Sequence, residues 1–426
     1  MPPLLSFIIP AFNAEHTIDD AVRSVLSQSR AEIELIVVDD GSTDSTFARA
    51  SAIADPRVRV VRRTNRGVAA SRNLGLVLAQ GDFVCFLDAD DMVLPEFASA
   101  SLGAIGECDA ISTAYRDTDP SRNPSSQAWY PALSELRLDR LRISNPLSIG
   151  ATIFRTDGLR EVTRHFGDAF PSDCQVEDWE LLLRFTSLGA RWAEPIQTPL
   201  MLCRLTPGSR SAQSRTVWQD GRALIDRWVP ARERASALRT WTLSQFARAL
   251  ANDEAEFAAH LSHEVGSLTD TDIPTLVGSL RVWATRQRTI TGQRVGFSHL
   301  RSRIARAAPV FADRIASEAL RPSWDELALL ASNSLAPHEA IVVYGFGRNG
   351  REASRALSRA GITHKIIDDD PGFQSPLRTT VAELCPNHVI LLTPDRRVEL
   401  LAKLRSVRAS RILTPEMIHP ASADAA

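Results

Sequence analysis

Apolar residues follow two alternating periods along the first part of the chain. Short continuous apolar runs predict buried strands, and the stretches between them carry apolar residues every three or four positions, which predicts helices. The predicted strands are 5–9, 33–38, 58–62 and 83–87. The predicted helices are 17–27, 43–54 with Ser42 or Thr43 as its cap, and 68–79. Strands and helices in alternation favour a largely parallel sheet covered on both faces.

The pattern is less regular beyond the fourth predicted strand. A polar stretch, 117–126, contains two prolines and is predicted to be a loop. Residues 148–154 predict a strand, 179–188 a helix stopped by Gly189, and 195–204 an extended closing segment. We therefore expect the first domain to span residues 1–214.

Strand patterns disappear between residues 215 and 335. Segments rich in Arg, Ala and Leu with a helical period replace them, so we expect a helical region whose simplest role is a structural connector. The alternation returns in residues 336–420, with predicted strands at 340–344, 364–367 and 388–392. This last part predicts a small Rossmann-like domain.

Composition narrows the functional classes. The chain has 426 residues and a net charge of −2, so no global basic field indicates a nucleic-acid partner. Its five cysteines are far apart and form no C-x-x-C pair, which disfavours a zinc site or a disulfide framework and suits a reducing compartment. The first residues lack the pattern of a signal peptide, and no apolar run reaches membrane-spanning length. We expect a cytoplasmic protein without a membrane span.

Acidic residues gather after two of the predicted strands. Asp39 and Asp40 follow one strand in IELIVVDDGSTD, and Asp88, Asp90 and Asp91 follow another in GDFVCFLDADD. Open α/β sheets bind ligands at the carboxyl ends of their strands. Carboxylates gathered there repel one another unless a cation joins them, and Mg²⁺ typically takes one or two carboxylates together with substrate phosphates. The pattern indicates a site for a divalent cation and a diphosphate.

Five motifs occur in an order that is known from one enzyme family. SFIIPAFNAEHTIDDAVRSVLSQS, VVDDGSTD, NRGVAASRNLGL and FLDADD are followed by VEDWELLLRF at 176–185. Together they resemble the family 2 glycosyltransferases of the GT-A fold. The resemblance covers roughly the first half of the chain. It implies a nucleotide-diphospho-sugar transferase domain that moves a sugar to a hydroxyl acceptor.

The resemblance assigns a nucleotide pocket. It implies that the loop with Pro10, Phe12 and Glu15 and the acid Asp40 hold the base and ribose, and that Arg72 lies near the phosphates. An aromatic ring can stack on a base, and a guanidinium suits phosphate oxygens. The simpler explanation for Asp39 and Asp40 is that they cap the following turn.

The resemblance also assigns the metal and the base. It implies that Asp90, with Asp88 beside it, binds Mn²⁺ or Mg²⁺, and that Asp178, next to Glu177, takes the proton of the acceptor hydroxyl. Glu177 and Asp178 have a simpler explanation as acids that the helix dipole favours at a helix start. Asp91 has a simpler explanation as a helix cap. In the closing segment Cys203 stands where the family often has Tyr, so Arg204 and Ser209 carry less of the resemblance.

The last domain carries a separate motif. Gly345, Gly347 and Gly350 follow a predicted strand and open a helix, and Asp368 lies at the distance expected for a ribose contact. The motif is consistent with a nucleotide site and equally with a degenerate module for packing or oligomerisation.

Three functions are consistent with these motifs. The first is a metal-dependent inverting glycosyltransferase of bacterial surface-glycan biosynthesis, which uses a UDP-sugar and a glycan or lipid-linked acceptor, without nucleic acid, either in the cytoplasm or peripherally at the inner membrane. The second is a sugar-nucleotide oxidoreductase or epimerase that uses the last domain. The third is an inactive nucleotide-sugar-binding module, and a homo-oligomer is compatible with all three.

Overall fold

The computed structural model describes most of the chain up to residue 291 and short stretches beyond it. The described residues are 5–29, 32–206, 213–269, 271–291, 302–303, 305–307, 340–344, 354–355, 357–359, 362–367, 388–392 and 411–413. The chain divides into two compact units, Met1–Arg294 and Val295–Ala426.

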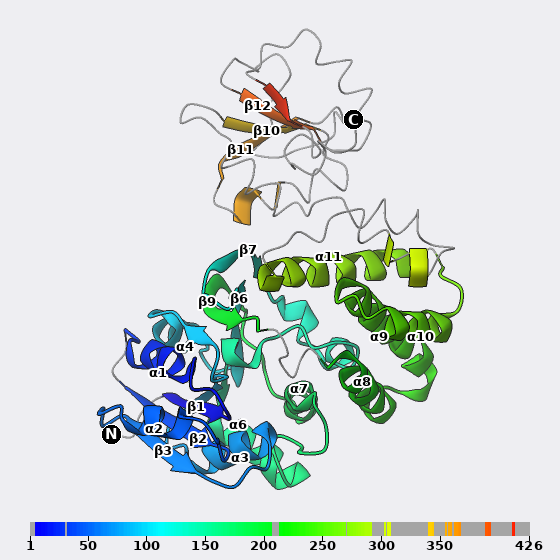
Figure 1. Cartoon of the computed structure of the whole chain (residues 1–426). Coiled ribbons are helices and arrows are strands. Elements are labelled where there is room, and N and C mark those ends of the chain that lie inside the picture. The colour runs from blue at the N-terminus through cyan, green and yellow to red at the C-terminus, as the bar shows by residue number, and fades with distance from the viewer. Residues whose placement is uncertain are drawn as a thin grey trace. The chain divides into compact units, whose positions relative to one another are not determined.

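The sheet of the first unit begins as a parallel sheet. Its first strands are β1 (Leu5–Ala11), β2 (Ile33–Asp39), β3 (Val58–Arg62) and β4 (Phe83–Phe86), in the spatial order β3-β2-β1-β4. Figure 1 labels the first three of them. All three pairings are parallel, so these strands end at the same edge of the sheet. The four predicted strands are confirmed.

The second half of the sheet is mixed. Its strands are β5 (Met92–Val93), β6 (Ala110–Thr118), β7 (Pro124–Trp129), β8 (Thr152–Arg155) and β9 (Ile196–Arg204). The order continues β4-β8-β6-β9-β5, with β7 on β6, and only the β6–β9 pairing is parallel. The largely parallel sheet that the sequence predicts is therefore confined to the first four strands.

The predicted loop at 117–126 is too long, because only residues 119–123 lie outside the strands. Strand β6 continues to Thr118, and β7 starts at Pro124 and pairs with β6 in an antiparallel hairpin. Proline has no amide hydrogen to give to a ladder, but it is tolerated where a strand begins and at a sheet edge. Pro124 occupies the first position of β7, so its presence did not exclude a strand.

Helices cover both faces of this sheet. They are α1 (Ile18–Leu26), α2 (Thr46–Ser51), α3 (Val68–Leu78), α4 (Phe97–Ala104), α5 (Leu138–Leu141), α6 (Thr156–Phe166) and α7 (Glu177–Ser187), with 3₁₀ turns at Leu133–Glu135 and Ile149–Ala151. Alternate residues of β1 enter two cores: Ile8 packs with α3 and α7, whereas Phe7 and Ile9 pack with α1 and α4. This alternation follows from the period of two along a strand. The expectation of a sheet covered on both faces is confirmed.

The cap predicted for the second helix is wrong. Helix α2 begins at Thr46, not at 43, and neither Ser42 nor Thr43 caps it. The Ser42 hydroxyl instead accepts a hydrogen bond from the Asn13 amide at 3.0 Å, and Thr43 bonds to the Asn13 side chain. The turn that contains Ser42 and Thr43 is thus hydrogen-bonded to the loop that follows β1.

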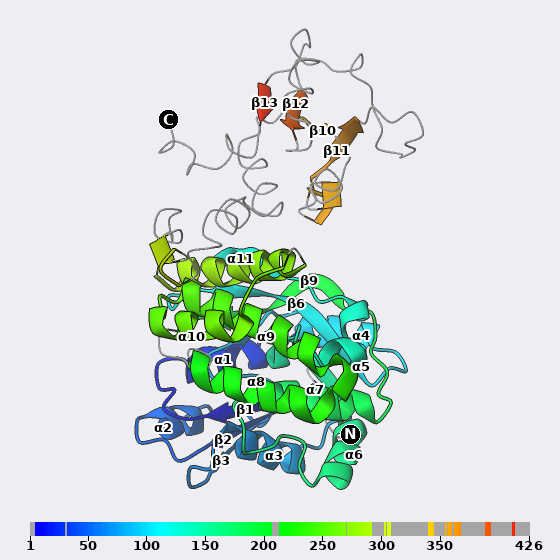
Figure 2. The ribbon, with the colours of Figure 1, turned by 90° about the vertical axis from the view of Figure 1, so that its right-hand side faces the viewer.

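Four long helices complete the first unit. They are α8 (Ser214–Trp228), α9 (Ala231–Ala251), α10 (Ala255–Val265) and α11 (Asp272–Thr291), as the helical period predicts. Figure 2 shows α8 alongside α7. Apolar residues of α8 and α9, among them Leu224 and Ala237, belong to the same core as Trp179 of α7. The boundary between residues 214 and 215 remains a prediction, but the helices share a core with the sheet.

The second unit contains a small parallel sheet. Its described strands are β10 (Ala340–Tyr344), β11 (His364–Ile367), β12 (His388–Leu392) and β13 (Arg411–Leu413), in the order β11-β10-β12-β13. Three of these strands are predicted from the sequence, and β13 is not. Gly345, Gly347, Gly350 and Asp368 lie outside the described residues. The Rossmann-like domain and its nucleotide site therefore remain predictions.

Within the described part of the chain, no helix is long and apolar enough to cross a membrane.

Candidate active site

The loop that follows β1 lies at the carboxyl edge of the parallel strands. Pro10 is buried within β1, whereas the ring of Phe12, just beyond the strand, is 50% exposed. Glu15 does not point to open space: its carboxylate accepts a hydrogen bond from the Ser45 amide at 3.0 Å. The structure therefore leaves Phe12 available for stacking on a base and gives Glu15 a role in holding the loop.

The two acids after β2 have different partners. Asp39 accepts a hydrogen bond from the Ser42 amide at 3.3 Å, so it caps the turn, which is the simpler role predicted for it. Asp40 is buried and accepts from the amides of Arg66 and Gly67, the latter at 2.7 Å. These amides lie at the start of α3, so Asp40 anchors the helix that carries Arg72. Its contact with a nucleotide remains a prediction.

Arg72 lies between two motifs that are far apart in the sequence. It is 2% exposed, and it donates to Asp88 at 2.6 Å and to Glu177 at 2.8 Å. Burial disfavours its charge, but the carboxylates around it hold the pKa of Arg72 above its usual value. Phosphate contact remains a prediction for this residue. In the structure, its guanidinium joins the acid after β4 to the acid that opens α7.

The acids after β4 differ in exposure and partners. The side chain of Asp88 is 40% exposed even though it pairs with Arg72. Burial raises the pKa of Asp90 to about 6, and the charge of Asp88 adds to that shift. Asp91 is buried and accepts from the Arg204 amide of β9 at 2.8 Å. The helix cap predicted as the simpler role of Asp91 is therefore wrong, because this carboxylate fastens β9 to the acidic segment.

Arg204 completes that fastening. Its side chain donates to the Asp90 carbonyl at 3.0 Å and pairs with Asp20 of α1, also at 3.0 Å. Arg204 thus holds the backbone of the acidic segment through its own side chain as well as through its amide. Ser209, from the same closing segment, lies outside the described residues.

Asp88 and Asp90 offer two carboxylates to a divalent cation. Within the described residues, no group of three or more His, Cys, Asp or Glu side chains is arranged to hold a metal ion. Two hard carboxylates with some solvent exposure fit a cation whose remaining ligands are water and substrate phosphates. The donor set therefore suits Mg²⁺ or Mn²⁺ that binds together with a diphosphate.

Asp178 stands at the start of α7, next to Glu177. One of its carboxylate oxygens accepts from the Trp179 amide at 2.8 Å, and the other accepts from the side chain of Asn145 at 3.1 Å. Burial raises the pKa of Asp178 to about 6; the charge of Glu177 adds to the shift and Arg72 opposes it. A carboxylate with a pKa near the working pH is suited to accept a proton. Sequence reasoning missed Asn145, which lies in an irregular segment without a motif.

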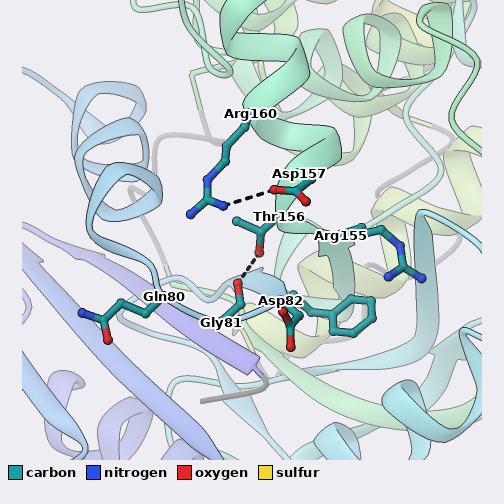
Figure 3. Close-up of a pocket in the computed structure, with 8 residues that line it drawn as sticks. Gln80, Gly81, Asp82, Arg155, Thr156, Asp157 and Arg160 are labelled. Carbon is teal, nitrogen blue, oxygen red and sulfur yellow. Dashed lines mark hydrogen bonds and ion pairs between the residues drawn. The ribbon is translucent and has the colours of Figure 1, made fainter. Parts of the chain in front are cut away.

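A pocket elsewhere on the first unit does not belong to this site. It has a volume of about 280 Å³ and is lined by residues such as Asp82, Arg155 and Arg160 (Figure 3). Asp82 precedes β4, whereas Asp88 follows it, so the pocket lies at the opposite edge of the sheet. Its arginines are already bonded: Arg160 pairs with Asp157, and Arg155 donates to the Cys108 carbonyl.

Comparison with known proteins agrees with this geometry. Residues 6–162 match the family model "Glycosyl transferase family 2". An uncharacterized glycosyltransferase of Haemophilus influenzae is 47% identical over 94 residues, which is 21% of this chain and 38% of that protein. The Escherichia coli protein UDP-Glc:alpha-D-GlcNAc-diphosphoundecaprenol beta-1,3-glucosyltransferase WfgD is 42% identical over 90 residues, 21% of this chain and 36% of that protein.

The matches cover parts of both chains. The alignments reach less than two thirds of the length of each of these two relatives. Among solved structures, S. aureus TarS 1-349, in complex with UDP-GlcNAc, is similar with a TM-score of 0.46 and 20% identity, over 74% of this chain and 90% of that one. The mixed sheet with acids at its carboxyl edge agrees with the GT-A fold that the motifs predict. Residues 6–162 belong to a family 2 glycosyltransferase domain, as the motifs indicate.

Proposed function

We propose that this protein is an inverting glycosyltransferase that uses a divalent cation, a UDP-sugar and a hydroxyl acceptor. One observation carries the proposal: Arg72 bonds to both Asp88 and Glu177 and so joins the metal-binding motif to the acidic start of α7. The acid beside Glu177, Asp178, therefore belongs to the same cluster as the acids that would face the diphosphate.

The reaction would be a single displacement. The acceptor oxygen attacks the anomeric carbon of the sugar while the bond from that carbon to the diphosphate oxygen breaks, and the electron pair leaves with the diphosphate. Asp178 takes the proton of the attacking hydroxyl, and Asn145 orients its carboxylate. A cation bound at Asp90 and Asp88 would supply Lewis-acid stabilisation of the leaving diphosphate.

The relatives suggest the class of donor and acceptor. The name of WfgD states that it uses UDP-glucose and a sugar linked through a diphosphate to undecaprenol. A second relative, 42% identical over 95 residues, is named as a succinoglycan biosynthesis protein of Rhizobium meliloti. We therefore extend the proposal to bacterial surface-glycan assembly, with a glycan or lipid-linked acceptor at the cytoplasmic face of the inner membrane.

A donor panel tests the reaction. Hydrolysis of UDP-glucose, UDP-N-acetylglucosamine, UDP-galactose and GDP-mannose is measured with Mn²⁺, for the wild type and for Asp178→Asn. Removal of a general base costs on the order of 10²–10⁴-fold in rate, while UDP binding by calorimetry should stay unchanged. Asp173→Asn is the matched control, because this exposed acid lies just before α7.

The two other functions give different results in this panel. An inactive binding module would bind UDP without hydrolysing any donor. An oxidoreductase or epimerase would convert the sugar without releasing UDP. Two results for Asp178→Asn would show that the proposed base is misassigned. One is hydrolysis at the wild-type rate, and the other is a loss of UDP binding as large as the loss of hydrolysis.

A further inference from the structure

Helix α8 holds the backbone segment that leads into α7. The carboxylate of Asp220, on α8, accepts a hydrogen bond from the Gln175 amide at 2.7 Å. Gln175 lies three residues before Asp178, immediately ahead of the first turn of α7. A carboxylate is a strong acceptor for a backbone amide, and this bond is partly shielded from solvent. The start of α7 is therefore fixed by Arg72 through Glu177 and by α8 through Gln175.

A ring contact from α9 reaches the residue next to the proposed base. The ring of Trp241 packs on that of Trp179, with centroids 5.0 Å apart and an angle of 44° between the planes. Trp179 is 1% exposed, and its amide donates to Asp178. A shift of Trp179 would therefore move the carboxylate that its amide holds.

The packing between α8 and α9 requires a glycine. A Cβ atom at Gly221 would lie 2.3 Å from Cζ2 of Trp241, so any larger residue would displace the ring. The Trp241 indole also donates to the Trp218 carbonyl at 3.0 Å, which fixes its orientation. Glycine lowers helix stability, so its place inside α8 is explained by this close approach.

A third contact lies one turn further along α7. Arg227 of α8 pairs with Glu180 at 2.7 Å. Glu180 is buried and also bonds to Arg184, so its carboxylate is held by two guanidinium groups. Because Arg227 is itself half exposed, this pair contributes orientation rather than much stability.

We propose that α8 and α9 are part of the catalytic assembly, with Asp220 and Trp241 as positioning residues for the carboxylate of Asp178. The inference rests on the proposed function. It assigns to the helical region a role beyond connection, because three contacts from α8 and α9 converge on the start of α7 and the segment before it. Displacing a catalytic group by about 1 Å can cost about 10²-fold in rate, so modest relaxation of α7 would be visible.

Substitutions at Asp220 test the proposal on the full chain. Asp220→Ala removes the acceptor of the Gln175 amide, and Asp220→Asn keeps a carbonyl oxygen in its place. Asp226→Ala is the matched control, because this acid lies on the same helix, is 55% exposed and pairs loosely with Arg234, at 3.7 Å. The readouts are hydrolysis of the best donor in the panel with Mn²⁺, donor KM, UDP affinity, the pH profile and Tm.

For Asp220→Ala we expect a fall in kcat of about 10-fold or more, since the base is misplaced, with donor KM and UDP affinity within about twofold of wild type. The acidic limb of the pH profile should also move, because the surroundings of Asp178 change. Asp220→Asn should recover most of kcat, and Asp226→Ala should match the wild type. Wild-type kcat with an unmoved acidic limb, accompanied only by a lower Tm, would overturn the proposal.

Trp241→Phe provides a second variant that retains a ring over Trp179. We expect a smaller fall in kcat with the same unchanged donor affinity, even if Asp220→Ala does not fold. A positioning role would be refuted if Trp241→Phe keeps the wild-type kcat while Asp220→Ala either keeps the wild-type kcat or does not fold. The proposed function fails separately, if Asp178→Asn hydrolyses the donor as well as the wild type does.

Discussion

Arg72 and Glu177 form a buried ion pair of 2.8 Å across 105 residues of sequence. Both side chains are 2% exposed. The same guanidinium reaches Asp88 at 2.6 Å, so one residue of α3 connects the end of β4 to the start of α7. The proposed metal site and the proposed base are thus parts of one electrostatic unit, and five predictions follow from its geometry and from the organisation of the chain.

Replacing Arg72 should damage stability and activity together. Arg72→Met leaves the buried carboxylate of Glu177 without this partner, and breaking a buried pair typically costs about 3–5 kcal/mol. We expect a lower free energy of unfolding in urea and loss of donor hydrolysis. Arg160→Met is the control, because both side chains of the Arg160–Asp157 pair are at least half exposed. A variant with the wild-type unfolding midpoint would contradict the structural role of Arg72.

Asp90→Asn should remove metal-dependent binding. The substitution keeps the size of the side chain and removes the charge that would hold a cation against the diphosphate. We expect an intact fold by circular dichroism, loss of turnover, and UDP affinity that no longer responds to Mn²⁺. Wild-type turnover that persists in excess EDTA would refute the metal assignment.

Activity should fall as the pH drops through about 6. Asp178 acts as a base only when deprotonated, and burial raises its pKa to about 6. The profile of kcat should therefore rise from pH 5 to pH 7 in the wild type, measured with one donor at saturating concentration. A flat profile over this range would exclude Asp178 as the titrating base.

The same shift makes a prediction for stability. A carboxyl with a folded pKa of about 6 and an unfolded value of 3.8 binds its proton better in the folded state. Its contribution to stability is complete below the unfolded value and is lost as pH rises through the folded one. The difference in Tm between wild type and Asp178→Asn should change over this window. An unchanged difference would place the pKa of Asp178 elsewhere.

The first unit should act without the second. A protein truncated after about Leu335 retains Asp40, Asp90 and Asp178 together with α8–α11. We expect it to hydrolyse its sugar nucleotide, even if acceptor transfer or oligomerisation is lost. A soluble, folded truncation without any hydrolysis would show that the last domain completes the active site, and that the predicted division into domains is wrong.

The sequence by itself determined the elements and the motifs of this protein. The strand runs, the helical periods of α8–α11 and the order of the acidic motifs are local patterns, because burial of one face imposes its period on the residues of each element. The parallel first strands also placed Asp40 and Asp88 at one edge of the sheet. Asp178 was found by its motif, and its role as the base remains a prediction.

Only the tertiary structure decided which side chains meet. Arg72 bonds to two acids, Asp91 holds the β9 backbone, Asn145 orients Asp178, and Asp220 holds the segment before α7. Each pair joins segments that the strand order or the helix packing brings together. Strand order and helix packing leave no periodic signal in the sequence. The partner of a buried charge depends on which distant segment is packed against it, and that choice is made by the whole fold.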